Sequence, residues 1–168
     1  NIETSFTNTY DPEDVDLYDP ADSTILIEAN KTLVGRDMKS GEEFKFELTN
    51  ESGTVVANGV VKNAKDGAKA PIAFTEAYND ALVLSAVGKY FYNLRETTAS
   101  GNGLVSDKTN YRIEVTVVDN GGKLEASYII VNHADDAADF TNTYTAKAAE
   151  HTVTAGKVLN GKKLLDDE

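Results

Sequence analysis

The chain has 168 residues, a net charge of −12 and no cysteine. This length suits one domain of ordinary size, alone or with fragments of its neighbours, and allows a sizeable core. The absence of cysteine excludes disulfides, a thiolate nucleophile and thiolate metal sites. The acidic balance argues against nucleic acid or an anionic membrane as a partner, because both need a basic surface. No apolar run is long enough to span a membrane, and because the chain begins within a strand pattern at Asn1, we expect a mature or excised segment.

Two segments precede the first long strand pattern. Residues 1–10 are predicted to form a short strand that ends in Phe-Thr-Asn-Thr-Tyr, Phe6 to Tyr10. Residues 11–23 carry six acidic side chains and two prolines, a composition typical of a solvated linker. A calcium-binding loop is the alternative, but the acids lack the glycine turn and the final glutamate of that motif.

The first long strand pattern places a lysine on an apolar face. Segment 25–31 alternates apolar and polar residues, which predicts a half-buried strand. Its apolar face carries Ile25, Ala29 and also Lys31. A lysine at a strand end that lays its stem on the core and holds its amine in water is the alternative. The same alternation predicts a second strand at 43–48, with its aromatic residues inward.

The next stretch has weaker patterns. Residues 51–71 are rich in Gly, Asn and Lys, and Asn58-Gly59 predicts a hairpin turn between two valine pairs. A short strand is expected at 72–74. One or two helical turns are expected at 79–86, and they are the only helix expected in the domain.

A clear alternating strand at 89–96 contributes a carboxylate to the apolar side. Tyr90, Tyr92 and Leu94 share one face, and Glu96 falls on the same face. A glutamate at a strand end is ordinarily exposed, so the position of Glu96 alone does not show that its side chain is buried.

Two further strands and a turn follow a polar loop at 97–110. Residues 111–117 alternate with their apolar positions on one face, and residues 123–131 do the same. Asp119-Asn-Gly-Gly122 between them is a strong turn signal.

The final strand repeats the motif seen near the N-terminus. In Phe-Thr-Asn-Thr-Tyr, Phe140, Asn142 and Tyr144 share one face, and two aromatic residues indicate that this face points inward. An amide that faces a core needs a hydrogen-bonding partner there. The sequence therefore predicts a buried polar contact for Asn142.

The two histidines, His133 and His151, are predicted to be surface residues. No cysteine, third histidine or inward carboxylate is spaced to make either one a metal ligand or a catalytic base. We therefore expect no metal site and no cofactor.

The terminal segments match opposite ends of the central one. Lys157-Val-Leu-Asn-Gly161 matches Lys31-Thr-Leu-Val-Gly35 with an offset of 157 − 31 = 126, and the two Phe-Thr-Asn-Thr-Tyr motifs are offset by 140 − 6 = 134. The chain is therefore predicted to be a window on a tandem array. We expect the terminal strands, 1–10 and 152–165, to pack on the central repeat or to complete a sheet in an adjacent molecule. The predicted parts are the last strand of a preceding repeat (1–10), an acidic linker (11–23), a complete repeat (24–145), and a linker with the first strand of a following repeat (146–168).

Several short alternating strands with at most one short helix predict an all-β sandwich. Lys31, Glu96 and Asn142 then project into its core from the first, a middle and the last strand. Burial disfavours charge, so Lys31 can be a neutral amine and Glu96 a neutral acid. We expect Glu96 to donate its proton toward the Asn142 carbonyl while Lys31 Nζ attacks the carboxamide carbon and ammonia leaves. The product is a Lys31–Asn142 isopeptide bond.

Five motifs lie in order along the central repeat: Lys31-x-Leu-x-Gly-Arg36, Gly41-Glu-x-Phe-x-Phe-x-Leu48, Gly88-x-Tyr-x-Tyr-x-Leu-x-Glu96, Tyr111-x-Ile-x-Val-x-Val117 and Phe140-Thr-Asn-Thr-Tyr144. Together they resemble the pilin isopeptide-linkage domain of Gram-positive surface fibres. The resemblance implies an immunoglobulin-like or collagen-adhesin-B-like sandwich, a self-formed Lys31–Asn142 bond promoted by Glu96, and extracellular display on a cell wall in a pilus or a long adhesin. It also implies that Asn8 and Lys157 are crosslinked to partners in neighbouring repeats.

The function expected from these patterns is that of a structural stalk module in a cell-surface fibre. Its partners would be neighbouring repeats or subunits, and its only chemistry one self-crosslinking turnover, so it is not an enzyme in the ordinary sense. A ligand-binding adhesin domain on the same sandwich is the alternative, with loops 51–71 and 97–110 as the binding surface, although neither contains an aromatic residue. A hydrolase is disfavoured, because no Ser-His-Asp or paired-carboxylate site is evident.

Overall fold

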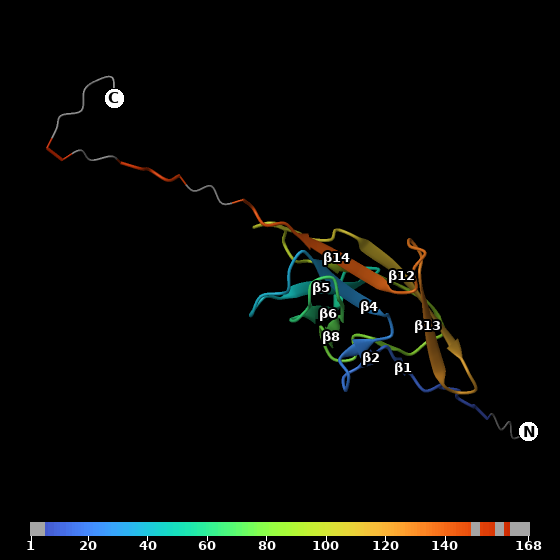
Figure 1. Cartoon of the computed structure of the whole chain (residues 1–168). Helices are drawn as coiled ribbons and strands as arrows, with labels where there is room; N and C mark the ends of the chain where they lie inside the picture. The colour runs from blue at the N-terminus through green and yellow to red at the C-terminus, as the bar shows by residue number, and fades with distance from the viewer. Residues whose placement is uncertain (1–5, 149–151, 157–159, 162–168) are drawn as a thin grey trace, which may run out of the picture.

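The computed structural model describes residues 6–148, 152–156 and 160–161. Within these residues the chain forms fourteen strands and no helix (Figure 1). Ten strands make a six-stranded and a four-stranded sheet, and the other four make two short ribbons. The all-β sandwich predicted from the alternating patterns is confirmed.

The larger sheet has the order β13-β12-β10-β5-β6-β8, and every neighbouring pair in it is antiparallel. Alternation along each strand places apolar side chains on the face that meets the other sheet. In β5, for example, Phe44, Phe46 and Leu48 are fully buried while Lys45 is exposed. Its strands are β5 (Phe44–Asn50), β6 (Val55–Val61), β8 (Ala73–Glu76), β10 (Gly88–Glu96), β12 (Asn110–Asp119) and β13 (Leu124–Ile130).

The smaller sheet has the order β11-β14-β4-β7 and contains one parallel pair. In that pair, β14 lies beside β4 with Phe140 opposite Lys31 and Asn142 opposite Leu33. The first and last long strands of the predicted repeat are therefore neighbours that run in the same direction. The strands of this sheet are β4 (Ala29–Val34), β7 (Lys69–Pro71), β11 (Leu104–Val105) and β14 (Ala138–Tyr144).

Phe140 joins the two sheets at the centre of the core. It is 1% exposed, and its ring centroid lies 5.1 Å from that of Phe46 and 5.0 Å from that of Tyr111. Both partners belong to the larger sheet. Tilted and edge-on aromatic pairs at this spacing are favourable beyond the area they bury, so the first residue of the Phe-Thr-Asn-Thr-Tyr motif fixes β14 against the opposite sheet.

The acidic segment expected to be a solvated linker packs on the sandwich. It contains β1 (Val15–Asp16), which pairs with β9 (Val83–Leu84), and β2 (Tyr18–Asp19), which pairs with β3 (Thr24–Ile25). Between them Leu17 is only 4% exposed, and its backbone N–H donates to Leu82 O. The acidic side chains are at the surface and one leucine is in the core. The linker is predicted from the number of acidic residues, and that number does not indicate whether a single leucine is buried.

The hairpin turn predicted at Asn58-Gly59 is wrong, because both residues lie in the middle of the continuous strand β6. A Cβ at Gly59 would lie 2.7 Å from an Ile72 side-chain atom and 2.9 Å from one of Phe74. Because glycine has no Cβ, these side chains can pack directly against the backbone of β6. Consequently segment 51–71 is not one exposed loop, because it contains the strands β6 and β7.

The helical turns predicted at 79–86 are also absent. Residues 83–84 form β9, and its pairing with β1 supplies the backbone hydrogen bonds that a helix would otherwise supply. The side chain of Glu76 accepts the backbone N–H of Leu82 at 2.9 Å and holds the preceding turn.

The described terminal residues, 6–10 and 152–156, carry no strand and are exposed. Among these described residues, only Tyr10 has a side-chain hydrogen bond to the sandwich, which its hydroxyl donates to Asp119 Oδ2 at 2.5 Å. Packing of these described residues on the central repeat is therefore limited, and pairing with an adjacent molecule stays a prediction. Figure 1 shows residues 6–10 leaving one end of the sandwich and residues 145–148 leaving the opposite end.

Candidate functional site

Lys31 is fully buried in the core between the sheets. The strand β4 alternates buried and half-buried residues, and Lys31 occupies a buried position with 0% exposure. Its Nζ lies 5.0 Å from the ring centroid of Phe44. The alternative of an amine that reaches water from a strand end is excluded. A buried lysine needs a specific partner.

Glu96 supplies that partner from the opposite sheet. It is the last residue of β10, lies opposite Phe46 of β5, and is 7% exposed. Its Oε2 accepts from Lys31 Nζ at 2.9 Å, and its Oε1 accepts from Asn142 Nδ2 at 2.7 Å. One carboxyl group therefore contacts both nitrogen atoms that an amide exchange would involve.

Asn142 completes the cluster from β14, again with 0% exposure. Its Oδ1 accepts the backbone N–H of Asp107 at 2.7 Å. Because a backbone N–H can only donate, this bond fixes the orientation of the carboxamide, with Nδ2 toward Glu96. The expectation that Glu96 donates toward the Asn142 carbonyl therefore needs correction: the Asp107 N–H occupies the carbonyl side, and Glu96 contacts the nitrogen side.

Burial sets the electrostatics of the cluster. Desolvation lowers the pKa of Lys31 below its ordinary value, although the hydrogen bond that Lys31 donates to Glu96 and the charges of Glu96 and Asp107 act in the opposite direction. A lowered pKa makes the neutral amine available nearer to neutral pH. A neutral amine is the form that attacks a carbonyl carbon.

Asp107 is a site residue that the sequence patterns did not single out. It lies between β11 and β12, and its carboxylate accepts the backbone N–H of Thr109 at 2.8 Å through Oδ1 and that of Thr141 at 2.7 Å through Oδ2. Burial would raise the pKa of Asp107, but these hydrogen bonds and the charge of Lys31 together lower it. The Asp-x-Thr spacing is typical of an Asx turn, yet nothing in that signal indicates which strand the loop meets.

The residues after Lys31 in its motif close the end of the sheet over Tyr144. Gly35 has φ 102°, and a Cβ there would lie 2.2 Å from the carbonyl oxygen of Tyr144, so only glycine permits the close approach. The guanidinium of Arg36 lies 4.6 Å from the ring centroid of Tyr144 and binds both carboxyl oxygens of Glu42. These contacts hold the ends of β4 and β14 together.

Not all of the other residues that the sequence singled out are described. Asn8, a predicted crosslink residue, is exposed and therefore lies apart from the buried cluster, whereas Lys157 and His151 lie outside the described residues. His133 is at the surface, with its ring centroid 4.6 Å from that of Tyr111. Among the residues that the structure describes, there is no set of three side chains that could hold a metal ion, and no helix that could cross a membrane.

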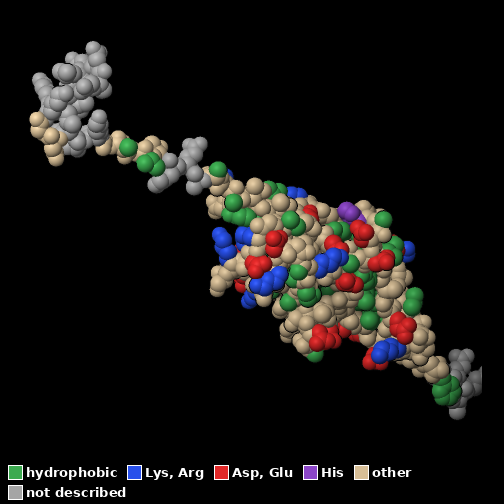
Figure 2. All heavy atoms as spheres, viewed as in Figure 1, with side chains coloured by type: hydrophobic (Ala, Val, Ile, Leu, Met, Phe, Trp, Pro, Cys, Tyr) green, Lys and Arg blue, Asp and Glu red, His purple; other side chains and the backbone are tan. Residues whose placement is uncertain are grey.

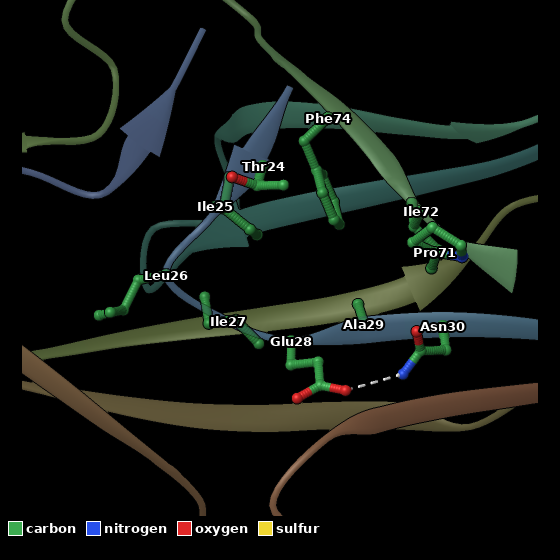
Figure 3. Close-up of a pocket in the computed structure, with 10 residues that line it drawn as sticks. All are labelled: Thr24, Ile25, Leu26, Ile27, Glu28, Ala29, Asn30, Pro71, Ile72 and Phe74. Atoms are coloured by element: carbon green, nitrogen blue, oxygen red, sulfur yellow. Dashed lines mark hydrogen bonds between the residues drawn. The ribbon is translucent and has the colours of Figure 1, made fainter. Parts of the chain in front are cut away.

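One surface hollow among the described residues offers little further chemistry. It is lined by 24–30 and by residues of 71–74 and is largely apolar. Of its three polar side chains, Thr24, Glu28 and Asn30, the last two are hydrogen-bonded to each other (Figure 3). On the face shown in Figure 2, acidic and basic side chains are interspersed. The buried cluster is therefore the candidate functional site.

Comparisons with known proteins identify the family of the domain. A family model named FctA and described as a Spy0128-like isopeptide containing domain matches residues 27–145. Among solved structures, the major pilin protein T-13 from Streptococcus pyogenes matches with a TM-score of 0.50 and 15% identity, over 70% of this chain and 51% of that chain. At this identity the likeness is one of fold, and this chain spans about half the length of that pilin. Curated proteins give no match.

The resemblance that the five sequence motifs carry is thus confirmed by a model covering most of the chain. The chain belongs to the FctA family, whose members contain a Spy0128-like isopeptide domain.

Proposed function

We propose that this domain is a tension-bearing module of a cell-surface pilus or related fibre, closed by an isopeptide bond between Lys31 and Asn142 that the domain forms by itself. The observation that carries the proposal is the arrangement of Glu96, which accepts hydrogen bonds from Lys31 Nζ and Asn142 Nδ2 inside an apolar core. Membership in the isopeptide-containing family supports it.

The chemistry is an exchange of one amide nitrogen for another. Transfer of a proton from Lys31 Nζ to Glu96 Oε2 leaves a neutral amine, which attacks the Asn142 side-chain carbon and forms the Nζ–Cγ bond. Glu96 then delivers this proton to Nδ2 through the contact of its Oε1 and accepts the second proton that Nζ loses, while the Cγ–Nδ2 bond breaks and ammonia leaves. Reactants and products balance, since one amine and one primary amide give one secondary amide and one ammonia.

The surroundings favour this exchange over a stable ion pair. A buried ammonium and carboxylate lose their hydration, and their attraction seldom repays that cost. In the crosslinked product the lysine carries no charge, and the new amide can still hydrogen-bond to Glu96. Burial thus acts in the direction of the reaction.

The position of the bond suits a chain under tension. The first and last long strands, β4 and β14, are parallel neighbours, and the chain leaves the sandwich at opposite ends (Figure 1). Force applied along the fibre would therefore shear these two strands past each other. A covalent link from Lys31 to Asn142 would carry the force directly from one to the other, so that the residues between them would bear none of it.

The same link would also replace the disulfides that the chain lacks. An amide bond is not opened by reduction. By the same chemistry, Asn8 would be the acceptor of a preceding repeat and Lys157 the nucleophile of a following one.

Force spectroscopy on a polyprotein tests this function. The bond would hide 142 − 31 = 111 residue steps, so Asn142→Ala should release about 400 Å of additional contour length on unfolding, whereas the wild-type domain should not. Thr143→Ala, an exposed neighbour on the same strand, is the matched control and should behave like the wild type. Full extension of the wild-type domain would refute the proposal.

A further inference from the structure

The loop between β11 and β12 contacts the reacting amide on the side that Glu96 does not reach. The Asp107 backbone N–H donates to Asn142 Oδ1 at 2.7 Å. A donor in this position faces the oxygen on which negative charge would develop when the carbonyl carbon is attacked. Preorganised donors of this kind are a large contribution to catalysis in acyl transfer.

The Asp107 side chain fixes where that N–H points. Its two carboxyl oxygens each accept a backbone N–H, one from Thr109 in its own loop and one from Thr141 in β14, the residue next to Asn142. The loop is therefore attached to the strand that carries the acceptor amide. Ser106, the preceding residue, is 3% exposed, and its N–H donates to Ser100 Oγ at 2.9 Å.

We propose that the backbone N–H of Asp107 stabilises the oxyanion formed on Asn142 Oδ1 during isopeptide formation, and that the Asp107 carboxylate is the positioning group that aims it. This inference rests on the proposed Lys31–Asn142 bond. When Nζ bonds to Cγ, the carbonyl electron pair moves onto Oδ1. It returns when the Cγ–Nδ2 bond breaks, and the Asp107 N–H is already directed at Oδ1 throughout.

The carboxylate acts through position rather than through its charge. Its negative charge raises the pKa of Lys31 and so works against formation of the neutral amine. Its contribution must then come from the loop geometry, where a misplacement of about 1 Å can cost about a hundredfold in rate.

The test follows bond formation in protein newly made in a reconstituted translation reaction. Samples are quenched in acidic denaturant at intervals, and the crosslinked fraction is read from the intact mass. Replacing Asp107 by its α-hydroxy acid removes only the N–H and keeps the carboxylate, and we expect formation to slow by about 10²- to 10³-fold. The matched control is the α-hydroxy acid replacement of Ser106, which removes a neighbouring N–H of the same loop that does not contact Asn142.

Side-chain variants test the positioning role. Asp107→Ala should slow formation by up to about a hundredfold, and Asp107→Asn, which keeps one acceptor oxygen, should restore part of the rate. Asp66→Ala is the control, because Asp66 also holds a backbone N–H, that of Gly35, without contacting the cluster. The profile of rate against pH should keep its shape in Asp107→Asn, as expected for a group that does not itself transfer the proton, and should shift only toward lower pH because the Asp107 charge no longer raises the pKa of Lys31.

The outcomes separate this inference from the proposed bond. A wild-type protein that never loses ammonia would refute the bond itself. A wild-type protein that crosslinks, together with an Asp107 ester that reacts as fast as the Ser106 ester, would overturn the role of the Asp107 N–H. An Asp107→Ala variant that reacts at the wild-type rate would overturn the positioning role.

Discussion

A double-mutant cycle on Lys31 and Asn142 separates a covalent link from a set of ordinary contacts. Lys31→Met replaces the fully buried amine with an apolar side chain of similar length, and Asn142→Ala removes the acceptor carboxamide. Each change eliminates the proposed bond. The double variant eliminates the same bond only once.

The magnitude follows from the length of chain that the bond would close. The two residues are 142 − 31 = 111 positions apart, and a crosslink across such a loop stabilises a protein by about 4 to 5 kcal/mol in the chain-entropy model. Lys31→Met also leaves Glu96 Oε2 without its donor, at about 1 to 3 kcal/mol. Asn142→Ala likewise leaves Glu96 Oε1 without its donor. The free energy of unfolding should therefore fall by about 5 to 8 kcal/mol in each single variant. The double variant should lose about 4 to 5 kcal/mol less than the sum of the two.

Urea unfolding monitored by far-UV circular dichroism and tyrosine fluorescence gives these free energies, since the chain has eight tyrosines and no tryptophan. Noncovalent neighbours couple by about 0.5 to 3 kcal/mol, so a larger coupling indicates the bond. The wild type should also have a smaller m-value, because a crosslinked chain exposes less surface on unfolding. Additive single effects with equal m-values would refute the reasoning.

Three further predictions address the cluster and its support. Glu96→Gln keeps the size of the side chain but cannot carry a proton between the two nitrogens, so bond formation should slow by about 10²- to 10⁴-fold; a rate equal to that of the wild type in a mass time course would contradict this role. In Asn142→Ala, which cannot crosslink, Lys31 should keep the lowered pKa that burial gives it in the folded wild-type domain. It then binds fewer protons folded than unfolded between the two pKa values, and stability should rise with pH in that range. Urea unfolding of this variant is compared with that of Lys31→Met/Asn142→Ala, which lacks the titrating amine. The free energy of unfolding of the single variant should rise relative to that of the double variant as pH rises. A difference that does not change with pH would argue against a buried amine. Gly59→Ala should destabilise the domain by about 1 to 3 kcal/mol through overpacking against Ile72 and Phe74, while the neighbouring Asn58→Ala should change the urea midpoint little; equal midpoints for the two would show that the site has room.

The strands and the three-residue cluster could be predicted because periodicity carries that information. Alternation along a strand assigns each side chain to a face, and it predicts Lys31, Glu96 and Asn142 to point inward, as they do in the structure. Each of these residues alone has an ordinary surface explanation. Three polar residues on three inward faces have no such explanation, and their coincidence indicates a shared site.

The features that sequence patterns missed depend on packing between distant segments. Asp107 lies in a loop, where no period relates it to β14. Leu17 is a single apolar residue among acids, and its burial depends on pairing with segments near Leu82. Asn58-Gly59 resembles a turn because Asn-Gly favours turns locally, whereas the side chains that pack on Gly59, those of Ile72 and Phe74, come from a later segment of the chain.

The intact mass of the purified domain tests the central claim most directly. Formation of the Lys31–Asn142 bond releases one ammonia, so the wild-type protein should weigh about 17 Da less than its sequence predicts, given one amide exchanged for another. The deficit should disappear in Lys31→Ala, Glu96→Ala and Asn142→Ala, and fragment masses should join the peptides that contain Lys31 and Asn142. A wild-type protein with the full mass of its sequence would contradict the account.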